Sequence, residues 1–382
     1  MSAPTLVANA TALRWIVLKI HQRCNMDCSY CYVYNLGDDS WKTRPKQVGD
    51  EVLLQVCRRI VEQCEQAHLE EFVVELHGGE PLLVGKKRFN EIIELMRAQC
   101  AGVRLKFLLQ TNGTLLDDEW SALFERHQVS IGISLDGPAE FADRRRYFKN
   151  GKGTTDKIIE ILQGIRRRDI APLSYGVLTV VDPALNGAEM INWYIEQDIE
   201  FADFLLPLGN RAQPPHGWTG PEPYTRFLLS AFDRWIALDG AAPRIRLFET
   251  IIRGHLGQKA HLDALGGDLG ALCVVETNGA IGISDVVRFC GGSLSGDVTT
   301  VFDIPFARHV DELGVDLVQD PAPACKRCSE FAACGGGYVP HRFDGVSFQN
   351  TSLYCESLYA LSRRAKQALV AALPPSMLGQ VA

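Results

Sequence analysis

The sequence predicts an α/β fold, in which a partial (β/α)6 barrel is followed by a small α+β domain. Over the first 210 residues, short apolar runs alternate with amphipathic stretches of helical period. The apolar runs are nearly continuous and rich in β-branched residues, which is typical of parallel strands that helices cover. From about residue 266 this pattern ends, and glycine and cysteine become frequent.

The barrel is expected to contain six strands. They are Trp15–Ile20, Phe72–His77, Leu105–Thr111, Val129–Asp136, Leu173–Val181 and Phe201–Leu208. The helices expected between them are Asp50–Glu65, Lys86–Arg97, Asp117–His127, Thr154–Arg167 and Ala188–Gln197, with Asp50 and Asp117 as N-caps. Because no seventh or eighth unit follows, we expect an open barrel rather than a closed one.

Four segments are expected along the chain: an N-terminal arm (1–14), the barrel (15–210), a helical bridge (211–265) and a C-terminal domain (266–382). The bridge contains a loop rich in glycine and proline and two helices, and the last domain contains a short strand and a terminal helix. These elements are Arg211–Pro223, Tyr224–Leu238, Arg246–Leu256, Ala280–Ile283 and Ser357–Leu373. The last domain has little apolar sequence to bury, so we expect bound metal to supply its core.

The composition is that of a soluble globular protein, with 46% hydrophobic and 22% charged residues in a chain of 382. A net charge of −7 argues against a nucleic-acid partner. No apolar run approaches the ~20 residues needed to cross a membrane. The N-terminus has neither the basic nor the apolar region of a secretory signal, so we expect a cytoplasmic protein.

Twelve cysteines are the unusual feature of the composition, and two sets of them suggest metal sites. The first set, Cys24, Cys28 and Cys31, has the spacing C-x3-C-x2-C directly after the first expected strand. Three thiolates can hold three irons of a [4Fe–4S] cluster and leave the fourth iron open to another ligand. The alternatives are a zinc site and three unrelated buried cysteines.

The second set, Cys325, Cys328, Cys334 and Cys355, supplies four thiolates, enough for a closed site that holds either a [4Fe–4S] cluster or zinc. Cys273 and Cys290 cannot hold a further cluster by themselves, so either ligands other than cysteine assist them or that site is missing. We expect the site to be missing and the two residues to be ordinary buried thiols.

The first cysteine motif resembles the signature of the radical SAM superfamily, and over about residues 14–210 further motifs of that family follow the ends of the expected strands. The resemblance implies that Tyr30 is the aromatic residue beside the third cysteine, and that Gly78, Gly79 and Glu80 hold the methionine amino group of S-adenosylmethionine. It also implies that the ribose and carboxylate of the cofactor contact residues at the next strand ends, which are Thr111, Asn112 and Ser134. Arg146 or Arg144 is expected to pair with the carboxylate, although a solvated basic patch is an equal alternative.

The second cysteine set resembles the SPASM domain, also called a SPASM/twitch-like auxiliary cluster domain, of peptide-modifying radical SAM enzymes. This sequence departs from the fullest form of that domain, because Tyr338 stands where a further cysteine is expected. The segments Glu276–Gly279, Cys334–Phe343 (CGGGYVPHRF) and Gln349–Cys355 resemble one branch of the family, the cyclophane-forming peptide maturases. His341 and Arg342 are expected to brace the cluster loop rather than to act on substrate.

The resemblance implies an enzyme that cleaves S-adenosylmethionine and uses the 5′-deoxyadenosyl radical to cross-link a ribosomally made precursor peptide that carries a leader. The bond would join an aromatic ring carbon to a β-carbon in a three-residue cyclophane. A flavodoxin or ferredoxin would donate electrons, at least one auxiliary [4Fe–4S] cluster would accept one, and Asp136 would be the catalytic base. The alternatives within the family are formylglycine formation of the sulfatase-maturing type and thioether cross-linking. A non-catalytic iron–sulfur or zinc sensor is the alternative of a different class.

Overall fold

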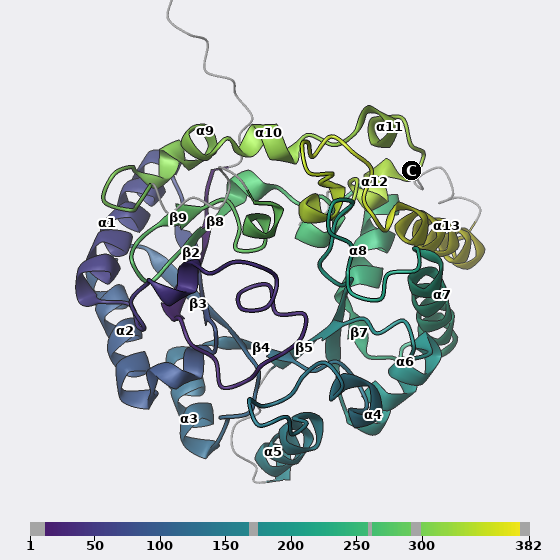
Figure 1. The fold of residues 1–382 in the computed structure, drawn as a ribbon, viewed down its shortest axis with the longest axis horizontal. Helices are drawn as coiled ribbons and strands as arrows, with labels where there is room; N and C mark the ends of the chain where they lie inside the picture. Colours follow the sequence, from purple (N-terminus) through teal and green to yellow (C-terminus); the bar gives the residue numbers. More distant parts are fainter. Residues whose placement is uncertain (1–11, 168–174, 259–261, 292–298, 375–382) are drawn as a thin grey trace, which may run out of the picture.

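The structure is a computed structural model, and it describes residues 12–167, 175–258, 262–291 and 299–374. One curved sheet of nine strands forms its centre, in the order β7-β6-β5-β4-β3-β2-β1-β8-β9. Helices surround the outer face of this sheet, and the loop after β1 crosses the middle of the view in Figure 1. This arrangement confirms the expected open partial barrel.

The strands β1 to β8 run parallel to their neighbours, and only β9 is antiparallel. Their bounds are β1 Trp15–His21, β2 Glu71–Gly78, β3 Arg104–Thr111, β4 Ser130–Ser134, β5 Tyr175–Val180, β6 Phe201–Leu205, β7 Arg244–Ile245, β8 Leu272–Val275 and β9 Ile281–Gly282. Burial alternates along the strands, so that in β1 Ile16 and Leu18 are buried while Trp15 and Val17 are half-buried. The buried face packs against the helices, and the other face lines the interior of the barrel.

The helices that cover the barrel are α1 Asp50–Ala67, α2 Lys86–Gln99, α3 Asp118–His127, α4 Ala139–Ala142, α5 Thr155–Arg167, α6 Gly187–Glu196, α7 Glu222–Ala237 and α8 Arg246–His255. Short helices follow toward the C-terminus: α9 His309–Leu313, α10 Val315–Gln319, α11 Pro323–Lys326 and α12 Phe331–Cys334, before the long α13 Cys355–Ala372. Both α12 and α13 pack on α8, and α13 also packs on α7, so the C-terminal region is attached to one side of the barrel.

All six expected strands and all five expected barrel helices are present, although Leu173 and Ser174 of the fifth strand lie outside the described residues. Asp117 is an N-cap as expected, because its side chain accepts a hydrogen bond of 2.9 Å from the Trp120 amide. The prediction for Asp50 was wrong, since the cap is Gly49 and Asp50 is the first helical residue.

The sequence patterns did not reveal that the barrel sheet continues beyond its sixth strand. β8 pairs in parallel with β1, with Trp15 beside Leu272 and Leu18 beside Val275. Part of the expected C-terminal domain therefore belongs to the same sheet as the barrel. In the described part of the chain, no helix is long and apolar enough to cross a membrane.

Candidate active site

The inner face of the sheet borders a cavity of 1120 Å³, which we call the barrel cavity. Closed barrels of eight units fill this space with branched apolar side chains. Here several strands carry small or polar residues on the inner face, and these are Gln110, Gly132, Ser134 and Gly176. The loop after β1 and residues from the C-terminal region complete the wall, so the barrel holds a chamber rather than a packed centre.

Cys24, Cys28 and Cys31 all line the barrel cavity, on the loop between β1 and α1. Burial raises the pKa of Cys24 to about 12, with the Cys31 and Cys28 thiols adding to the rise, and it raises the pKa of Cys28 to about 11, with the Cys31 thiol adding to the rise. The three sulfurs are therefore close enough to repel one another when ionised. Cys24 Sγ also accepts hydrogen bonds from the Met26 amide at 3.4 Å and from Asn112 Nδ2 at 3.8 Å.

Gly78 and Gly79 lie against the backbone of this cysteine loop. The Gly79 amide donates to the His21 carbonyl at 2.8 Å, and the Glu80 amide donates to the Arg23 carbonyl at 3.0 Å. A Cβ at Gly78 would lie 2.1 Å from the His21 oxygen, and one at Gly79 would lie 2.6 Å from the Arg23 carbonyl. Only glycine permits this approach, so in the structure the two glycines position the cysteine loop.

Glu80 is buried, with 1% of its surface exposed, and its carboxylate joins the end of β2 to the end of β3. It accepts hydrogen bonds from Thr111 Oγ1 at 2.7 Å, from the Asn112 amide at 2.8 Å and from the Leu82 amide at 3.0 Å. Asn112 in turn donates to Asn25 Oδ1 at 2.9 Å. The structure thus brings Glu80, Thr111 and Asn112 together as a support for the cysteine loop, at the wall of the barrel cavity.

Tyr30, Asp136 and Arg146 form a second polar group at the wall of the barrel cavity. The Tyr30 hydroxyl donates to Asp136 Oδ2 at 2.6 Å and accepts from Arg146 Nη1 at 3.0 Å. Asp136 Oδ1 also accepts from the Val180 amide at 3.0 Å. Arg146 is 6% exposed, and among the described residues its Nε and Nη2 have no hydrogen-bond partner. Because Arg144 is exposed, Arg146 is the better candidate for a ligand carboxylate.

Ser134 lines the barrel cavity at the end of β4 and accepts a hydrogen bond of 2.8 Å from Gln110 Nε2. Its hydroxyl proton remains available for a ligand oxygen such as that of a ribose.

Sequence reasoning missed a buried charged group at the same cavity, formed by Lys19, Asp285, Tyr32 and His77. Lys19 Nζ lies 2.7 Å from Asp285 Oδ2 and 3.1 Å from His77 Nδ1. Asp285 Oδ2 also accepts a hydrogen bond from the Tyr32 hydroxyl. Burial alone would raise the pKa of Asp285, but the Lys19 ammonium holds it well below its usual range. Lys19 could have been noticed as a lone cation in an apolar strand, whereas nothing local to Asp285 indicates that it reaches the barrel.

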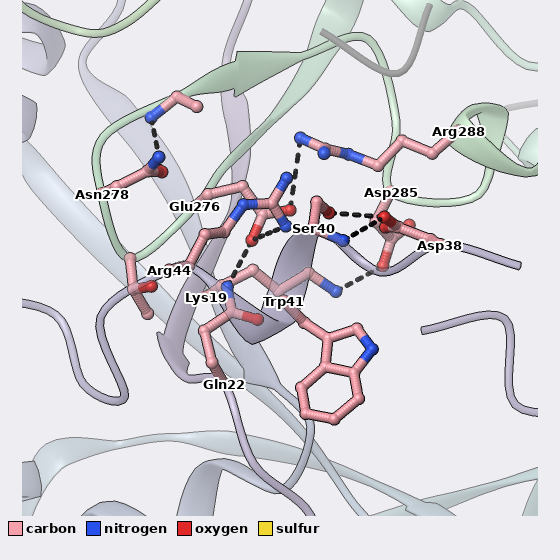
Figure 2. Close-up of polar contacts among 12 residues, drawn as sticks. Lys19, Gln22, Asp38, Ser40, Trp41, Arg44, Glu276, Asn278, Asp285 and Arg288 are labelled. Carbon is pink, nitrogen blue, oxygen red and sulfur yellow. Dashed lines mark hydrogen bonds and ion pairs between the residues drawn. The ribbon is translucent and has the colours of Figure 1, made fainter. Parts of the chain in front are cut away.

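A neighbouring group, centred on Glu276, ties the cysteine loop to the C-terminal region. Figure 2 shows Glu276 between Arg44, Gln22 and Arg288. Its carboxylate lies 3.2 Å from Arg44 Nη1 and 3.4 Å from Arg288 Nη2, and it accepts from Gln22 Nε2. Such a buried group holds two distant segments in one arrangement, because removing one partner would leave an uncompensated charge.

The C-terminal cysteines also form one group. Burial raises the pKa of Cys334 to about 12, and the thiols of Cys355, Cys325 and Cys328 add to that rise, so the four sulfurs are neighbours. Arg342 is buried and donates to the carbonyls of Gly335, Gly336 and Gly337, at distances between 2.7 and 3.1 Å. Arg342 therefore braces the glycine loop that follows Cys334, as expected.

Cys273 and Cys290 are both buried, and they lie in different apolar clusters. In the described part of the chain, no group of three or more His, Cys, Asp or Glu side chains is arranged to hold a single metal ion. The fit of the two cysteine sets to clusters therefore rests on the number and chemistry of their thiols. Three thiolates leave one iron open and four close the site.

Replacing Gly79 by Ala tests how the cysteine loop is positioned. The added methyl group would collide with the Arg23 backbone and with Tyr34 Oη, so the loop must move. We expect anaerobically reconstituted Gly79→Ala to fall from about eight irons per chain to about four, and to lose S-adenosylmethionine cleavage. Gly49→Ala is the control, because nothing lies within 4 Å of a Cβ at that position. Normal iron content and cleavage in Gly79→Ala would contradict this account.

Comparison with known proteins agrees with this geometry. Residues 18–193 match the family model of the radical SAM superfamily. The chain is 27% identical, over 90% of its length and 86% of the relative's, to a serine-type anaerobic sulfatase-maturating enzyme of Bacteroides thetaiotaomicron. It is 25% identical to a cysteine-type anaerobic sulfatase-maturating enzyme of Clostridium novyi, over 91% of this chain and 93% of the relative.

Solved structures share the fold. Native anSMEcpe with bound AdoMet superposes with a TM-score of 0.79 at 23% identity, covering 94% of this chain and 98% of the other. SuiB of Streptococcus suis bound to its precursor peptide SuiA gives a TM-score of 0.62 at 13% identity, covering 90% and 76%. The cofactors of the matched family, S-adenosylmethionine and a [4Fe–4S] cluster, suit the three thiols and the surrounding polar groups of the barrel cavity. Residues 18–193 are therefore a radical SAM domain.

Proposed function

We propose that this enzyme oxidises a side chain of a peptide to formylglycine. Removal of two hydrogens from a serine gives formylglycine directly, whereas removal of two hydrogens from a cysteine gives a thioaldehyde, which water hydrolyses to formylglycine with release of hydrogen sulfide. The observation that carries this proposal is the similarity to serine-type and cysteine-type anaerobic sulfatase-maturating enzymes over 90% and 91% of the chain. The barrel cavity of 1120 Å³ is slightly larger than the usual small-molecule pocket, and we propose that it takes a peptide side chain beside the cluster and S-adenosylmethionine. Two solved neighbours also hold peptides.

When bound, the cluster and S-adenosylmethionine supply the 5′-deoxyadenosyl radical that removes a hydrogen atom from a substrate carbon. The residues of this chain bind and orient S-adenosylmethionine. Arg146 offers two free N–H groups to a carboxylate, and Ser134 offers a hydroxyl. The four C-terminal thiols are proposed to hold an auxiliary cluster, and a flavodoxin or ferredoxin is proposed as electron donor.

Oxidation of the side chain also releases a proton, and the geometry favours Asp285 over Asp136 as its acceptor. Both oxygens of Asp136 already accept hydrogen bonds, from Tyr30 and from the Val180 amide. Asp285 lines the barrel cavity and receives Lys19 and Tyr32 on Oδ2, while no described residue donates to its Oδ1. Its lowered pKa keeps Asp285 ionised at neutral pH but makes it a weak base, so the support for its role is its place at the cavity and its open Oδ1. We propose that Asp136 instead positions Tyr30.

Cyclophane formation is the second candidate. It is favoured by the segment Cys334–Phe343, and by Tyr338, which lines the barrel cavity where a further cysteine is expected. Both reactions remove two hydrogens, so the site of the change decides between them.

The reaction is tested with the reconstituted enzyme, S-adenosylmethionine and two synthetic peptides. One carries a single Ser or Cys without aromatic residues, and the other carries an aromatic residue two positions from a β-methylene. We expect tandem mass spectrometry to show the change confined to the Ser or Cys, with reactivity toward a hydrazine. Loss of two hydrogens across a three-residue segment that resists backbone fragmentation would favour the cyclophane. An unchanged mass with deuterium uptake from solvent would contradict both.

Asp285→Asn tests the proton acceptor. Because positioned general bases contribute roughly 10²–10⁴-fold, we expect product formation to fall by about that factor. Cleavage of S-adenosylmethionine should continue, and the iron content should be unchanged. Asp316→Asn, at an exposed position of α10, is the control. If Asp285→Asn formed product at the normal rate, Asp285 would not be the acceptor.

A further inference from the structure

Arg342 is a fully buried cation beside the C-terminal cysteines. Only 1% of its surface is exposed, and the hydrogen bonds of its guanidinium all go to backbone carbonyls. The acceptors, at distances between 2.7 and 3.1 Å, are the carbonyls of Gln319, Gly335, Gly336 and Gly337. Among the described residues Arg342 forms no ion pair with a carboxylate. Its charge is therefore balanced at contact distance by carbonyl dipoles alone.

The negative charges that favour the ionised form of Arg342 are those of the cysteine set. Burial lowers the pKa of Arg342, and the Cys325 and Cys334 thiols oppose this effect most strongly. In the same way Arg342 offsets part of the rise that burial causes in the pKa of Cys325. Asp320 contributes less, and it already pairs with Lys326 at 2.6 Å. Because a buried cation needs a counter-charge, the thiolates of this set are its main electrostatic partners.

The glycine loop after Cys334 fixes the guanidinium next to the cysteine set. Gly335, Gly336 and Gly337 have φ angles of 59°, 83° and 73°, which are left-handed conformations that favour glycine. Three consecutive carbonyls of this loop accept hydrogen bonds from the one guanidinium. The positive charge is thus held in a single place, unlike the charge of a surface arginine.

Arg211 offers a matched comparison, because its charge also acts on the cysteine set. It offsets part of the rise that burial causes in the pKa of Cys355. Its side chain is exposed and donates to Thr351 Oγ1 at 2.7 Å. Water and salt screen an exposed charge far more than a buried one. Arg342 should therefore act on the set much more strongly than Arg211.

A buried cation at this place has a consequence for electron transfer. Reduction of an iron–sulfur cluster adds one negative charge, so a fixed cation nearby stabilises the reduced form more and raises the reduction potential. In the proposed reaction the substrate loses two hydrogens. One leaves as a hydrogen atom to the 5′-deoxyadenosyl radical. The other leaves as a proton, which Asp285 accepts, and an electron, which the auxiliary cluster takes up.

We propose that Arg342 raises the reduction potential of the auxiliary cluster held by Cys325, Cys328, Cys334 and Cys355, so that this cluster can accept the electron that leaves the substrate. Arg342 acts through its charge on the cluster and does not touch the substrate. This inference rests on the proposed function, since it assumes that the four thiols hold a [4Fe–4S] cluster.

The test measures a potential rather than turnover. The full chain with Cys24, Cys28 and Cys31 replaced by Ala is reconstituted without oxygen, so that only the C-terminal cluster is observed, and it is titrated with dithionite while the EPR signal of the reduced cluster is recorded. A unit charge within about 10 Å, at an effective dielectric constant of about 20, changes an equilibrium constant roughly tenfold. We expect Arg342→Gln to lower the potential by about 59 mV, which is that factor for one electron.

Two further variants separate the charge from the hydrogen bonds. Arg342→Lys keeps the charge but has fewer donors, so its potential should lie closer to that of the parent than to that of Arg342→Gln. Arg211→Gln is the control, and it should change the equilibrium constant for reduction by less than about twofold. A shift in Arg342→Gln no larger than in Arg211→Gln would overturn the inference. So would an equal shift in Arg342→Lys and Arg342→Gln.

If Arg342→Gln does not retain its iron, Gln319→Glu takes its place. It adds an opposing carboxylate on a residue whose carbonyl contacts Arg342, and it keeps an acceptor for the Leu269 amide, which donates to the Gln319 side chain at 3.0 Å. The potential should again fall, and an unchanged potential would overturn the inference. So would a C-terminal set that takes up zinc instead of an iron–sulfur cluster.

The two proposals fail in different ways. Formylglycine formation by an enzyme whose potential does not depend on Arg342 would overturn this inference and leave the proposed function standing. A potential that depends on Arg342 as described, in an enzyme that leaves both test peptides unchanged, would do the reverse.

Discussion

The close approach of Gly78 and Gly79 to the backbone of His21 and Arg23 is the constraint on which the rest of the site depends. It places the end of β2 against the cysteine loop at van der Waals distance, where no larger residue fits. Glu80 then connects the end of β2 to the end of β3, because its carboxylate accepts hydrogen bonds from Thr111 and Asn112. The three thiols are thus held by the two strands next to them rather than by their own loop alone.

The C-terminal region completes the site instead of merely following it. Asp285 reaches Lys19 and Tyr32, and Glu276 reaches Arg44 and Gln22, so two buried polar groups bind this region to the cysteine loop. Buried charges of this kind are costly unless they are paired, which favours one relative arrangement of the segments. The continuous sheet, in which β8 pairs with β1, fixes the same arrangement through the backbone.

The sequence was sufficient to predict the open barrel and its elements, because strand and helix periods are local. It also indicated both cysteine sets and the polar residues at the strand ends, for which the number and order of side chains are enough. It could not show β8, whose four residues carry little pattern. It also could not show Asp285, which contacts Lys19 although the two residues are 266 positions apart in the sequence. The contacts of Asp136 on both oxygens were equally invisible, since they depend on where the Tyr30 side chain turns.

The most direct test of the central claim is the cleavage of S-adenosylmethionine by a variant in which Cys24, Cys28 and Cys31 are all replaced by Ala. Under dithionite and without oxygen, the account predicts no 5′-deoxyadenosine from this variant, while the C-terminal set still binds iron. The matched control replaces the three buried cysteines of the α1 and α2 region, Cys57, Cys64 and Cys100, which lie in the apolar core. It should cleave normally. Continued formation of 5′-deoxyadenosine by the first variant would contradict the assignment of these thiols.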